Sequence, residues 1–350
     1  MTPLGDLLIA RIRATGPITL ADYMAECLLH PKYGYYTTRD PFGAAGDFTT
    51  APEISQMFGE LLGLALAQSW LDQGAPAFTL AELGPGRGTL MADALRATRS
   101  VPGFHAAMTI CLIEVSPTLR ARQKATLAAY KVQWRDHVRD LPQAPLYLIA
   151  NEFFDALPIR QFQRDGGGWR ERLVGVTQSG LGFGLTAPAP VGALAHRFAD
   201  TAQGQIVEVC PASASLMAGI GQRIVTHGGA ALIVDYGGWQ AGGDTFQALK
   251  SNAFADPFAE PGAADLTAHV DFAALAAASP AAHAYTSQGA FLNRLGITRR
   301  AARLAQSLGG PALQSHLAAT RRLTDAAEMG TLFKVLALHP VAGPPPPGMT

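Results

Sequence analysis

The segment that most constrains the fold of this chain is Leu80-Ala-Glu-Leu-Gly-Pro-Gly-Arg-Gly-Thr89. An apolar run reaches the acidic Glu82, and glycines then occupy three alternate positions, Gly84, Gly86 and Gly88, before a predicted helix. The order of strand, glycine turn and helix opens nucleotide-binding α/β domains, where glycine permits a positive φ and lets a ligand approach the backbone. The spacing G-x-G-x-G differs from the G-x-G-x-x-G of dinucleotide sites. It favours a cofactor without a pyrophosphate, S-adenosyl-L-methionine first, and a tight turn without a ligand is the alternative.

Predicted strands and helices alternate through the middle of the chain. Strands are expected over 78–83, 109–114, 130–134 and 145–150, with helices over 89–98 and 117–128 between the first three. This alternation predicts a parallel, doubly wound sheet. The other expected elements are helices over 4–14, 19–29, 55–72, 213–227 and 290–306, a hairpin that joins 159–164 to 169–176 through Gly166-Gly-Gly168, and strands over 182–185, 206–209, 231–235 and 333–338.

The 350 residues allow one large domain or two, at about 150 residues per domain. We expect an N-terminal helical region over 1–75 that completes the cofactor site, followed by a catalytic domain over 76–340. The stretch 240–285 is alanine-rich and irregular, and belongs to an insertion expected over about 240–330 that covers the site. The proline-rich end, 341–350, is expected to form a flexible tail.

Charge and cysteine usage exclude several classes of protein. The 27 basic and 27 acidic residues balance, so no overall field attracts the chain to nucleic acid or to an anionic membrane. No run of about 18 apolar residues occurs, which argues against stable insertion in a membrane. Cys27, Cys111 and Cys210 lie far apart without metal-ligand spacing, and Cys111, in an apolar run, is expected in the core. With no signal or transit peptide evident, we expect a cytoplasmic protein without a metal site.

Ligands of open α/β sheets bind at the carboxyl ends of the strands, so polar residues there are candidates for binding. Glu82 lies at the end of the first strand. Glu114 ends the second, where its carboxylate could accept from both ribose hydroxyls of a nucleoside; the alternative is an acidic residue favoured at a helix N-terminus. Asp136 follows the third strand and either accepts from an adenine amino group or is an exposed loop residue.

The fourth strand runs into Asn151-Glu-Phe-Phe-Asp-Ala-Leu-Pro158. Two carboxylates, Glu152 and Asp155, share this short loop with the Asn151 amide and two aromatic rings. Functional residues concentrate on such loops, so we expect catalysis or positioning of the acceptor here.

Other charged positions are weaker candidates. Asp47 lies in the glycine-rich segment before residue 50, and Asp235 ends a later strand, where it could instead cap the turn at Gly237. His269 stands alone, and a lone histidine is more often structural than catalytic. The run Arg299-Arg-Ala-Ala-Arg303 is expected to be a solvated helix face.

Five segments point to a known family. They are Gly46–Glu60, Glu82–Thr89, Asn151–Pro158, Asp265–Asp271 and Met329–Val335. Together they closely resemble the MidA family of class I S-adenosyl-L-methionine-dependent methyltransferases, and the resemblance runs from about Pro17 to Leu338. It implies a Rossmann-like α/β fold with a seven-stranded, mostly parallel sheet, N-terminal helices and a substrate-side insertion. It also implies that S-adenosyl-L-methionine, whose product is S-adenosyl-L-homocysteine, is surrounded by Gly46, Asp47 and Thr49, the glycine turn, Glu114 and the Asn151 loop.

The mitochondrial members of that family are protein arginine methyltransferases needed for the assembly of respiratory complex I. The resemblance therefore implies a protein substrate, a complex I subunit, with an arginine acceptor. Because a guanidinium stays protonated at physiological pH, carboxylates must hold it. We expect Glu152, with Asp155, to bind the acceptor guanidinium and Asn151 to orient the methionine end of the cofactor. Two alternatives stay open, a non-catalytic assembly factor that binds the cofactor and a small-molecule or O-methyltransferase.

Overall fold

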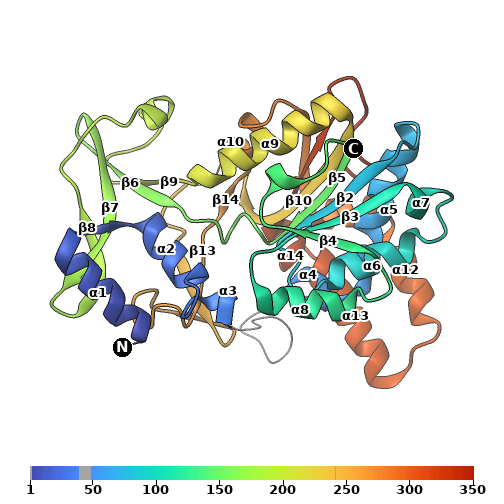
Figure 1. Cartoon of the computed structure of the whole chain (residues 1–350), viewed down its shortest axis with the longest axis horizontal. Coiled ribbons are helices and arrows are strands. Elements are labelled where there is room, and N and C mark those ends of the chain that lie inside the picture. The colour runs from blue at the N-terminus through green and yellow to red at the C-terminus, as the bar shows by residue number, and fades with distance from the viewer. Residues whose placement is uncertain (1, 39–48, 241) are drawn as a thin grey trace.

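The computed structural model describes residues 2–38, 49–240 and 242–350. Its central sheet has seven strands in the order β4-β3-β2-β5-β10-β16-β15, all parallel except β16. The strands β2 to β5 and β10 are labelled in Figure 1. The chain enters at β2, moves outward to β3 and β4, and returns to β5 on the other side of β2. The switch point between β2 and β5 is where ligands of such sheets bind. The predicted α/β class with a seven-stranded, mostly parallel sheet is confirmed. The strands are β2 (Phe78–Leu83), β3 (Met108–Ile113), β4 (Val132–Arg135), β5 (Leu146–Asn151), β10 (Gly229–Gly238), β15 (Ala282–Ser287) and β16 (Phe333–His339), and a short β14 (Val270–Asp271) extends the pairing of β10.

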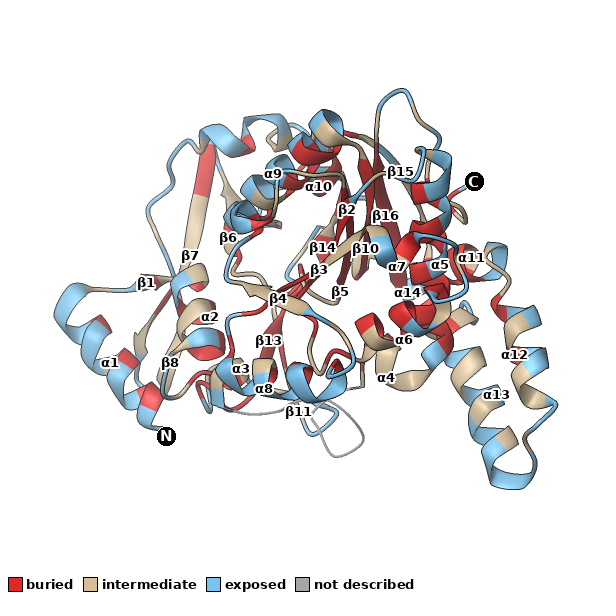
Figure 2. Ribbon diagram, turned by 45° about the vertical axis from the view of Figure 1, so that its right-hand side comes forward, coloured by how far each residue is buried: buried red, intermediate tan, exposed pale blue. Residues whose placement is uncertain are grey.

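Alternate residues of the central strands join hydrophobic clusters on opposite faces of the sheet. In β2, Leu80 belongs to the cluster with α5 and α6, whereas Ala81 belongs to the cluster with α9 and α10. Figure 2 shows the inner strands β2, β5, β10 and β16 as the most continuously buried part of the chain. Cys111 is fully buried in the second cluster, as expected for a core residue. The helices of this body are α4 (Ala51–Ile54), α5 (Gln56–Asp72), α6 (Thr89–Thr98), α7 (Phe104–Ala107), α8 (Pro117–Thr126), α9 (Pro211–His227), α10 (Phe272–Ala277), α11 (Gln288–Arg294), α12 (Ile297–Ala305), α13 (Gly310–Thr324) and α14 (Met329–Leu332). A 3-10 turn at Val138–Asp140 belongs to the body as well, and another, Gly192–Arg197, packs outside it.

A smaller lobe lies beside the sheet body (Figure 1). The N-terminal helices pack there against a five-stranded sheet, in which β7 pairs with β1, β6 and β8, and β6 pairs with β9. A three-stranded sheet in the order β12-β11-β13 contributes to the same hydrophobic cluster. The predicted hairpin joins β6 to β7 at Gly166, whose φ is +53°. The elements of the lobe are α1 (Pro3–Thr15), α2 (Leu20–Leu29), α3 (Tyr35–Thr38), β1 (Ile18–Thr19), β6 (Arg160–Asp165), β7 (Gly168–Thr177), β8 (Gly180–Leu185), β9 (Ile206–Val209), β11 (Gln247–Lys250), β12 (Ala253–Ala255) and β13 (Asp265–Thr267).

The structure divides the predicted N-terminal region 1–75 between the two parts. α1 and α2 belong to the smaller lobe, but α5 packs on α6 so closely that a Cβ at Gly63 would lie 2.7 Å from the Cβ of Ala94. The stretch 240–285, expected to be irregular, contains β11–β14, α10 and the first part of the edge strand β15. The helix expected over 290–306 is broken at Gly296, which has a φ of +88° and is the N-cap of α12.

Two further features concern the surface and the C-terminus. The last residues form no helix or strand, but Met349 packs into the hydrophobic cluster of the body, in contrast to the flexible tail that we expected. Within the described ranges, no helix is both long enough and apolar enough to cross a bilayer.

Candidate functional site

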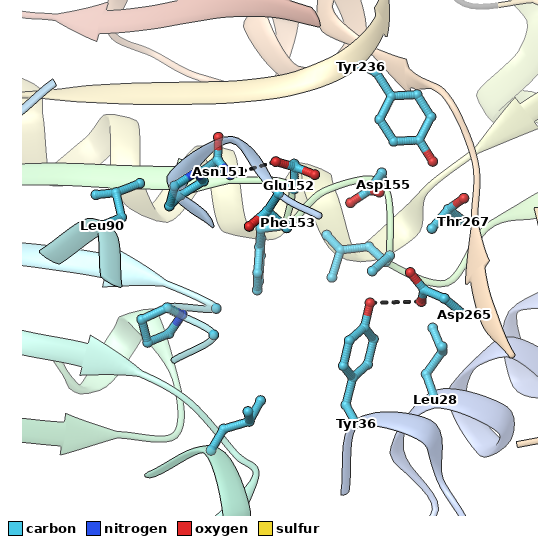
Figure 3. A pocket seen from close by; sticks show the side chains of 18 of the residues that line it. Leu28, Tyr36, Leu90, Asn151, Glu152, Phe153, Asp155, Tyr236, Asp265 and Thr267 are labelled. Atoms are coloured by element: carbon cyan, nitrogen blue, oxygen red, sulfur yellow. Dashed lines mark hydrogen bonds between the residues drawn. The ribbon is translucent and has the colours of Figure 1, made fainter. Parts of the chain in front are cut away.

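A cavity of about 600 Å³ lies at the carboxyl ends of β2, β3 and β5, where the sheet body meets the smaller lobe (Figure 3). The glycine turn, the loop after β5 and the start of α4 line it from the body. Tyr36 of α3 and residues of β11, β12 and β13 line it from the lobe. The site is therefore built from segments that lie far apart in the sequence.

The glycine turn holds three residues in the left-handed region. The φ angles of Gly84, Gly86 and Gly88 are +56°, +51° and +82°, which side chains other than glycine adopt only with strain. A Cβ on Gly84 would lie 2.8 Å from the ring of Phe153, so glycine is also required for space. Gly84 and Gly86 line the cavity, whereas Gly88 caps the start of α6 and does not line it.

Two acidic residues follow β3 and β4. Glu114 is buried at the cavity wall, and its two carboxylate oxygens accept hydrogen bonds from the Ser116 backbone (2.8 Å) and the Gln123 amide (3.1 Å). Because Ser116 is the N-cap of α8, Glu114 serves the helix start and faces the cavity at once. Asp136 also lines the cavity, but its side chain is largely exposed and pairs with Arg120 at 2.5 Å.

Glu82, near the end of β2, is buried at the cavity wall, and its Oε2 has no hydrogen-bond partner in the described part of the chain. Burial raises the pKa of this carboxyl to about 8. A buried polar atom without a partner is costly unless a ligand supplies one. Glu82 is therefore a candidate contact for a ligand group that donates a hydrogen bond.

The loop after β5 places Asn151 and Glu152 side by side. Glu152 has a φ of +49°, an uncommon conformation for a side chain of this size, and such strain tends to occur at functional sites. Its Oε1 accepts from the Ala51 backbone and from the Asn151 amide, both at 3.0 Å. The Oδ1 of Asn151 is buried and has no partner among the described residues. Burial raises the pKa of Glu152 to about 7.

Asp235 fixes this loop from the adjacent strand, β10. Its Oδ2 accepts from the backbone N–H groups of Phe153, Phe154 and Asp155 at 3.2, 2.9 and 3.3 Å, and its Oδ1 accepts from Tyr236 at 2.9 Å. The side chain is fully buried and does not line the cavity. Asp235 thus orders the loop, a role that neither reading of the sequence included.

A group of carboxylates occupies the end of the cavity nearest the smaller lobe. Asp155 and Asp265 are both buried, and the Tyr36 hydroxyl donates to Asp265 Oδ1 at 2.8 Å (Figure 3). Burial, and then repulsion from Asp235, Asp265 and Glu152, raises the pKa of Asp155 well above its ordinary value. Its Oδ1 has no partner among the residues that the structure describes. We call Glu152, Asp155 and Asp265 the acidic cluster.

Sequence reasoning missed Asp265 and Tyr36 as site residues. Asp265 begins one of the five segments that carry the family resemblance, and Tyr36 follows the helix expected over 19–29, but nothing in the sequence near either residue placed it opposite β5. His269 lines the cavity, and its ring lies edge-on to that of Tyr236.

The remaining candidates are placed as follows. Gly46 and Asp47 lie outside the described residues, and Thr49 lines the cavity. The Arg299–Arg303 run is not wholly solvated, because Arg300 makes a bidentate ion pair, at 2.7 and 3.0 Å, with the buried Glu60. Over the ranges that the structure describes, no group of histidine, cysteine and acidic residues could hold a metal ion.

These residues fit S-adenosyl-L-methionine. The cavity has the volume of a small-molecule site, about 300–1,000 Å³. The glycine turn exposes backbone to a ligand, and the unpartnered oxygens of Glu82 and Asn151 can accept from hydroxyl or ammonium groups.

Comparison with known proteins gives the same cofactor. Residues 61–291 match a family model described as S-adenosyl-L-methionine-dependent methyltransferase. The structure resembles a crystal structure of a Burkholderia thailandensis protein bound to S-adenosyl-homocysteine, with a TM-score of 0.83 and 31% identity over 99% of this chain and 92% of that one. A native crystal structure of a protein from the same organism gives a TM-score of 0.79, with 30% identity over 99% of this chain and 92% of that one.

Curated relatives cover almost the whole chain. The mouse protein named "Protein arginine methyltransferase NDUFAF7, mitochondrial" is 38% identical over 97% of this chain and 85% of its own length. A Drosophila melanogaster homologue of the same name is 37% identical over 96% of this chain and 85% of its own length. The expected cytoplasmic location is wrong by this comparison, because these relatives are mitochondrial proteins by name. On the family model, the relatives and the shared fold, the chain belongs to the S-adenosyl-L-methionine-dependent methyltransferases of the MidA family.

Proposed function

We propose that this methyltransferase modifies arginine in a protein, and that its acceptor is a subunit of respiratory complex I before or during assembly. The acidic cluster is the observation that carries the arginine acceptor. Three carboxylates converge at one end of the cavity, and burial raises the pKa of Glu152 and Asp155. Such a cluster is stabilised by a cation that enters between its members. The names of the mouse and fly relatives support the same acceptor.

The chemistry of a guanidinium fits the cluster. Arginine remains protonated, and its planar fork of N–H groups matches carboxylates. When bound, S-adenosyl-L-methionine supplies a methyl group on a sulfonium, which is transferred by in-line displacement. Glu152 and Asp155 hold the guanidinium plane and direct one nitrogen toward the cofactor end of the cavity, so positioning supplies most of the rate. A carboxylate with a pKa near 7, as at Glu152, is also suited to accept the proton that the methylated nitrogen loses.

The other walls suit the parts of the cofactor. Gly84 and Gly86 carry no side chain, so the cofactor can approach the backbone there. Thr49 lies at the cavity wall, and Gly88 is the N-cap of α6. Each Glu114 oxygen already accepts one hydrogen bond and keeps a further acceptor position for a ribose hydroxyl. We assign Asp136 to the adenine amino group.

The methionine end of the cofactor carries an ammonium group, which needs acceptors. We assign it to the free Oδ1 of Asn151 and to Glu82. The Oδ1 of Asn151 and the Oε2 of Glu82 are both buried, next to the switch point between β2 and β5.

The acidic cluster also separates this proposal from the two alternatives. A neutral hydroxyl acceptor would leave three carboxylates close together without a cation, so an O-methyltransferase is disfavoured. A non-catalytic assembly factor would need the cofactor-binding part of the cavity, but it would not need the acidic cluster that binds an acceptor. The strained φ of Glu152 favours catalysis, since such strain persists at sites where it has a use.

The experiment is methyl transfer from labelled cofactor to separately purified complex I subunits and to arginine peptides, with mass spectrometry of the product. We expect transfer to arginine, and a loss of at least about 100-fold in Glu152→Gln, as is typical for a positioned acid–base group. Glu26→Gln, on the outer side of α2, is the matched control and should transfer normally. Wild-type transfer by Glu152→Gln, or transfer only to hydroxyl compounds, would contradict the proposal. Cofactor binding without transfer to any subunit would favour the assembly factor.

A further inference from the structure

The cavity opening carries apolar side chains that the transfer chemistry does not use. Leu29 at the end of α2, Val115 after β3, Phe254 on β12 and Leu332 at the end of α14 line the cavity and stay exposed. Phe254 keeps 78% of its surface exposed, the largest fraction among the large exposed hydrophobic residues of the described chain. Single exposed apolar residues are ordinary, but several around one opening are typical of a binding surface. We call these four residues the apolar rim.

The rim joins both parts of the molecule. Leu29 and Phe254 belong to the smaller lobe, and Val115 and Leu332 belong to the sheet body. A chain segment that crosses the opening can therefore contact apolar side chains on both sides while its central residue enters the cavity. In extended conformation, residues two apart face the same side, about 7 Å from one another.

The charge below the rim restricts what can cross it. Among the described residues that line the cavity, acidic side chains greatly outnumber Arg87, the single lysine or arginine in the lining. They are Glu53, Glu82, Glu114, Asp136, Glu152, Asp155 and Asp265. Mutual repulsion already raises the pKa of Asp155, so a further carboxylate from an acidic segment is disfavoured here. An arginine flanked by apolar residues instead supplies a cation to the acidic cluster and matches the chemistry of the opening.

We infer that the apolar rim binds the acceptor segment on both sides of the modified arginine, and that it selects large apolar side chains within two residues of that arginine and rejects acidic ones. The inference rests on the proposed arginine acceptor and specifies its sequence context. A folded protein rarely exposes several large apolar residues together except on a surface that binds a partner. The acceptor segment is then accessible in a chain that has not yet folded or joined its partners, which identifies the class of substrate as an unassembled polypeptide.

The test uses the full-length enzyme and three peptides of equal length with a central arginine. The arginine is flanked on both sides by two leucines, two glutamines or two glutamates. Binding is measured by fluorescence anisotropy with S-adenosyl-homocysteine present, and transfer is measured separately with labelled cofactor. We expect the leucine peptide to bind at least about tenfold more tightly than the glutamine peptide, about 1.4 kcal/mol, and the glutamate peptide to bind most weakly.

Variants locate the effect. Phe254→Ser and Leu332→Ser should each remove most of the preference for leucine. Leu317→Ser is the matched control, since Leu317 on α13 is 49% exposed against 51% for Leu332 but does not line the cavity. Thermal melting shows whether each variant is folded, and the wild-type comparison of peptides needs no variant.

The two proposals fail in different ways. Equal affinity for the leucine and glutamine peptides would overturn the rim inference even if both were methylated. Preferential binding of the leucine peptide without methylation would overturn the arginine acceptor and leave the rim as a binding surface. No detectable binding of any peptide would overturn the rim inference.

Discussion

Asp235 is the residue whose removal should disturb the site most without touching the cavity. Four backbone N–H groups, those of Phe153, Phe154, Asp155 and Tyr236, donate to its carboxylate at 2.9–3.3 Å in a fully buried setting. Asp235→Ala leaves these donors without an acceptor. A buried donor left unpaired costs about 1–3 kcal/mol. Because Phe153 and Asp155 line the cavity, we use the lower value, and expect a loss of about 4 kcal/mol in the free energy of unfolding.

Asp235→Asn separates hydrogen bonding from charge. Asparagine keeps one oxygen for the three N–H groups of the loop, but its amide nitrogen then faces the Tyr236 N–H. We expect a loss of about 1–2 kcal/mol. Unfolding entropy is about 2.1 cal/mol/K per residue, or about 0.7 kcal/mol/K for 350 residues. The alanine variant should therefore melt about 5 °C below the wild type and the asparagine variant about 2 °C below it.

Three measurements test this reasoning. Thermal melting gives the shifts, calorimetry gives the affinity for S-adenosyl-L-methionine, and peptide transfer gives the activity. Since Asp235 raises the pKa of Asp155, the asparagine variant should reach full transfer at lower pH than the wild type. Asp140→Ala, at an exposed turn, is the control and should leave all three unchanged. An Asp235→Ala protein with a melting temperature within about 1 °C of the wild type and normal transfer would refute the assigned role.

Three further predictions concern the cavity. Because burial raises the pKa of Glu152 to about 7 and the guanidinium needs the ionised form, kcat/KM should rise between pH 6 and 8, and Glu152→Gln should lose this inflection; a flat wild-type profile would contradict it. Gly84→Ala should weaken cofactor binding at least about tenfold in calorimetry, through strain of about 1–2 kcal/mol and the clash with Phe153, whereas Gly166→Ala, with a similar φ and open space, should bind normally. Burial raises the pKa of Glu82 to about 8, so the folded protein holds its proton more tightly than the unfolded chain, and this contribution to stability is lost as pH rises from about 4.5 to 8. Glu82→Gln should remove that decline, by about 1.4 kcal/mol per unit of pKa shift, and unchanged pH dependence of melting would show that Glu82 is not the cause.

The sheet could be predicted from the sequence because buried parallel strands are continuous apolar runs. Leu146–Ala150 and Phe78–Leu83 are of this kind, and both were placed within a residue. The edge strand β15 was missed, since its sequence, Ala282-His-Ala-Tyr-Thr-Ser287, is polar and only partly buried along its length. β9 was expected as a strand, but its sequence does not indicate which strand it pairs with. In the structure it pairs with β6 in the smaller lobe.

The candidate site was predictable only where it follows the strand ends. Glu82, Glu114 and Asn151 come directly at those ends, so the topology of a doubly wound sheet brings them together. Tyr36 and Asp265 are 229 residues apart, and their hydrogen bond depends on how α3 and β13 pack in the lobe. No local pattern reports that packing. The roles assigned to all these residues stay predictions.

This difference between the two ends of the cavity has a consequence for specificity. The cofactor end is fixed by secondary structure, because the glycine turn and the strand ends cannot change without disturbing the sheet. The acceptor end is formed where Tyr36, Asp265 and Phe254 of the smaller lobe face the loop after β5. Substitutions in the lobe can therefore change which polypeptide is modified and leave the methyl donor the same. Relatives that share the glycine turn should then agree in cofactor, while agreement in acceptor should follow the residues of the lobe and the apolar rim.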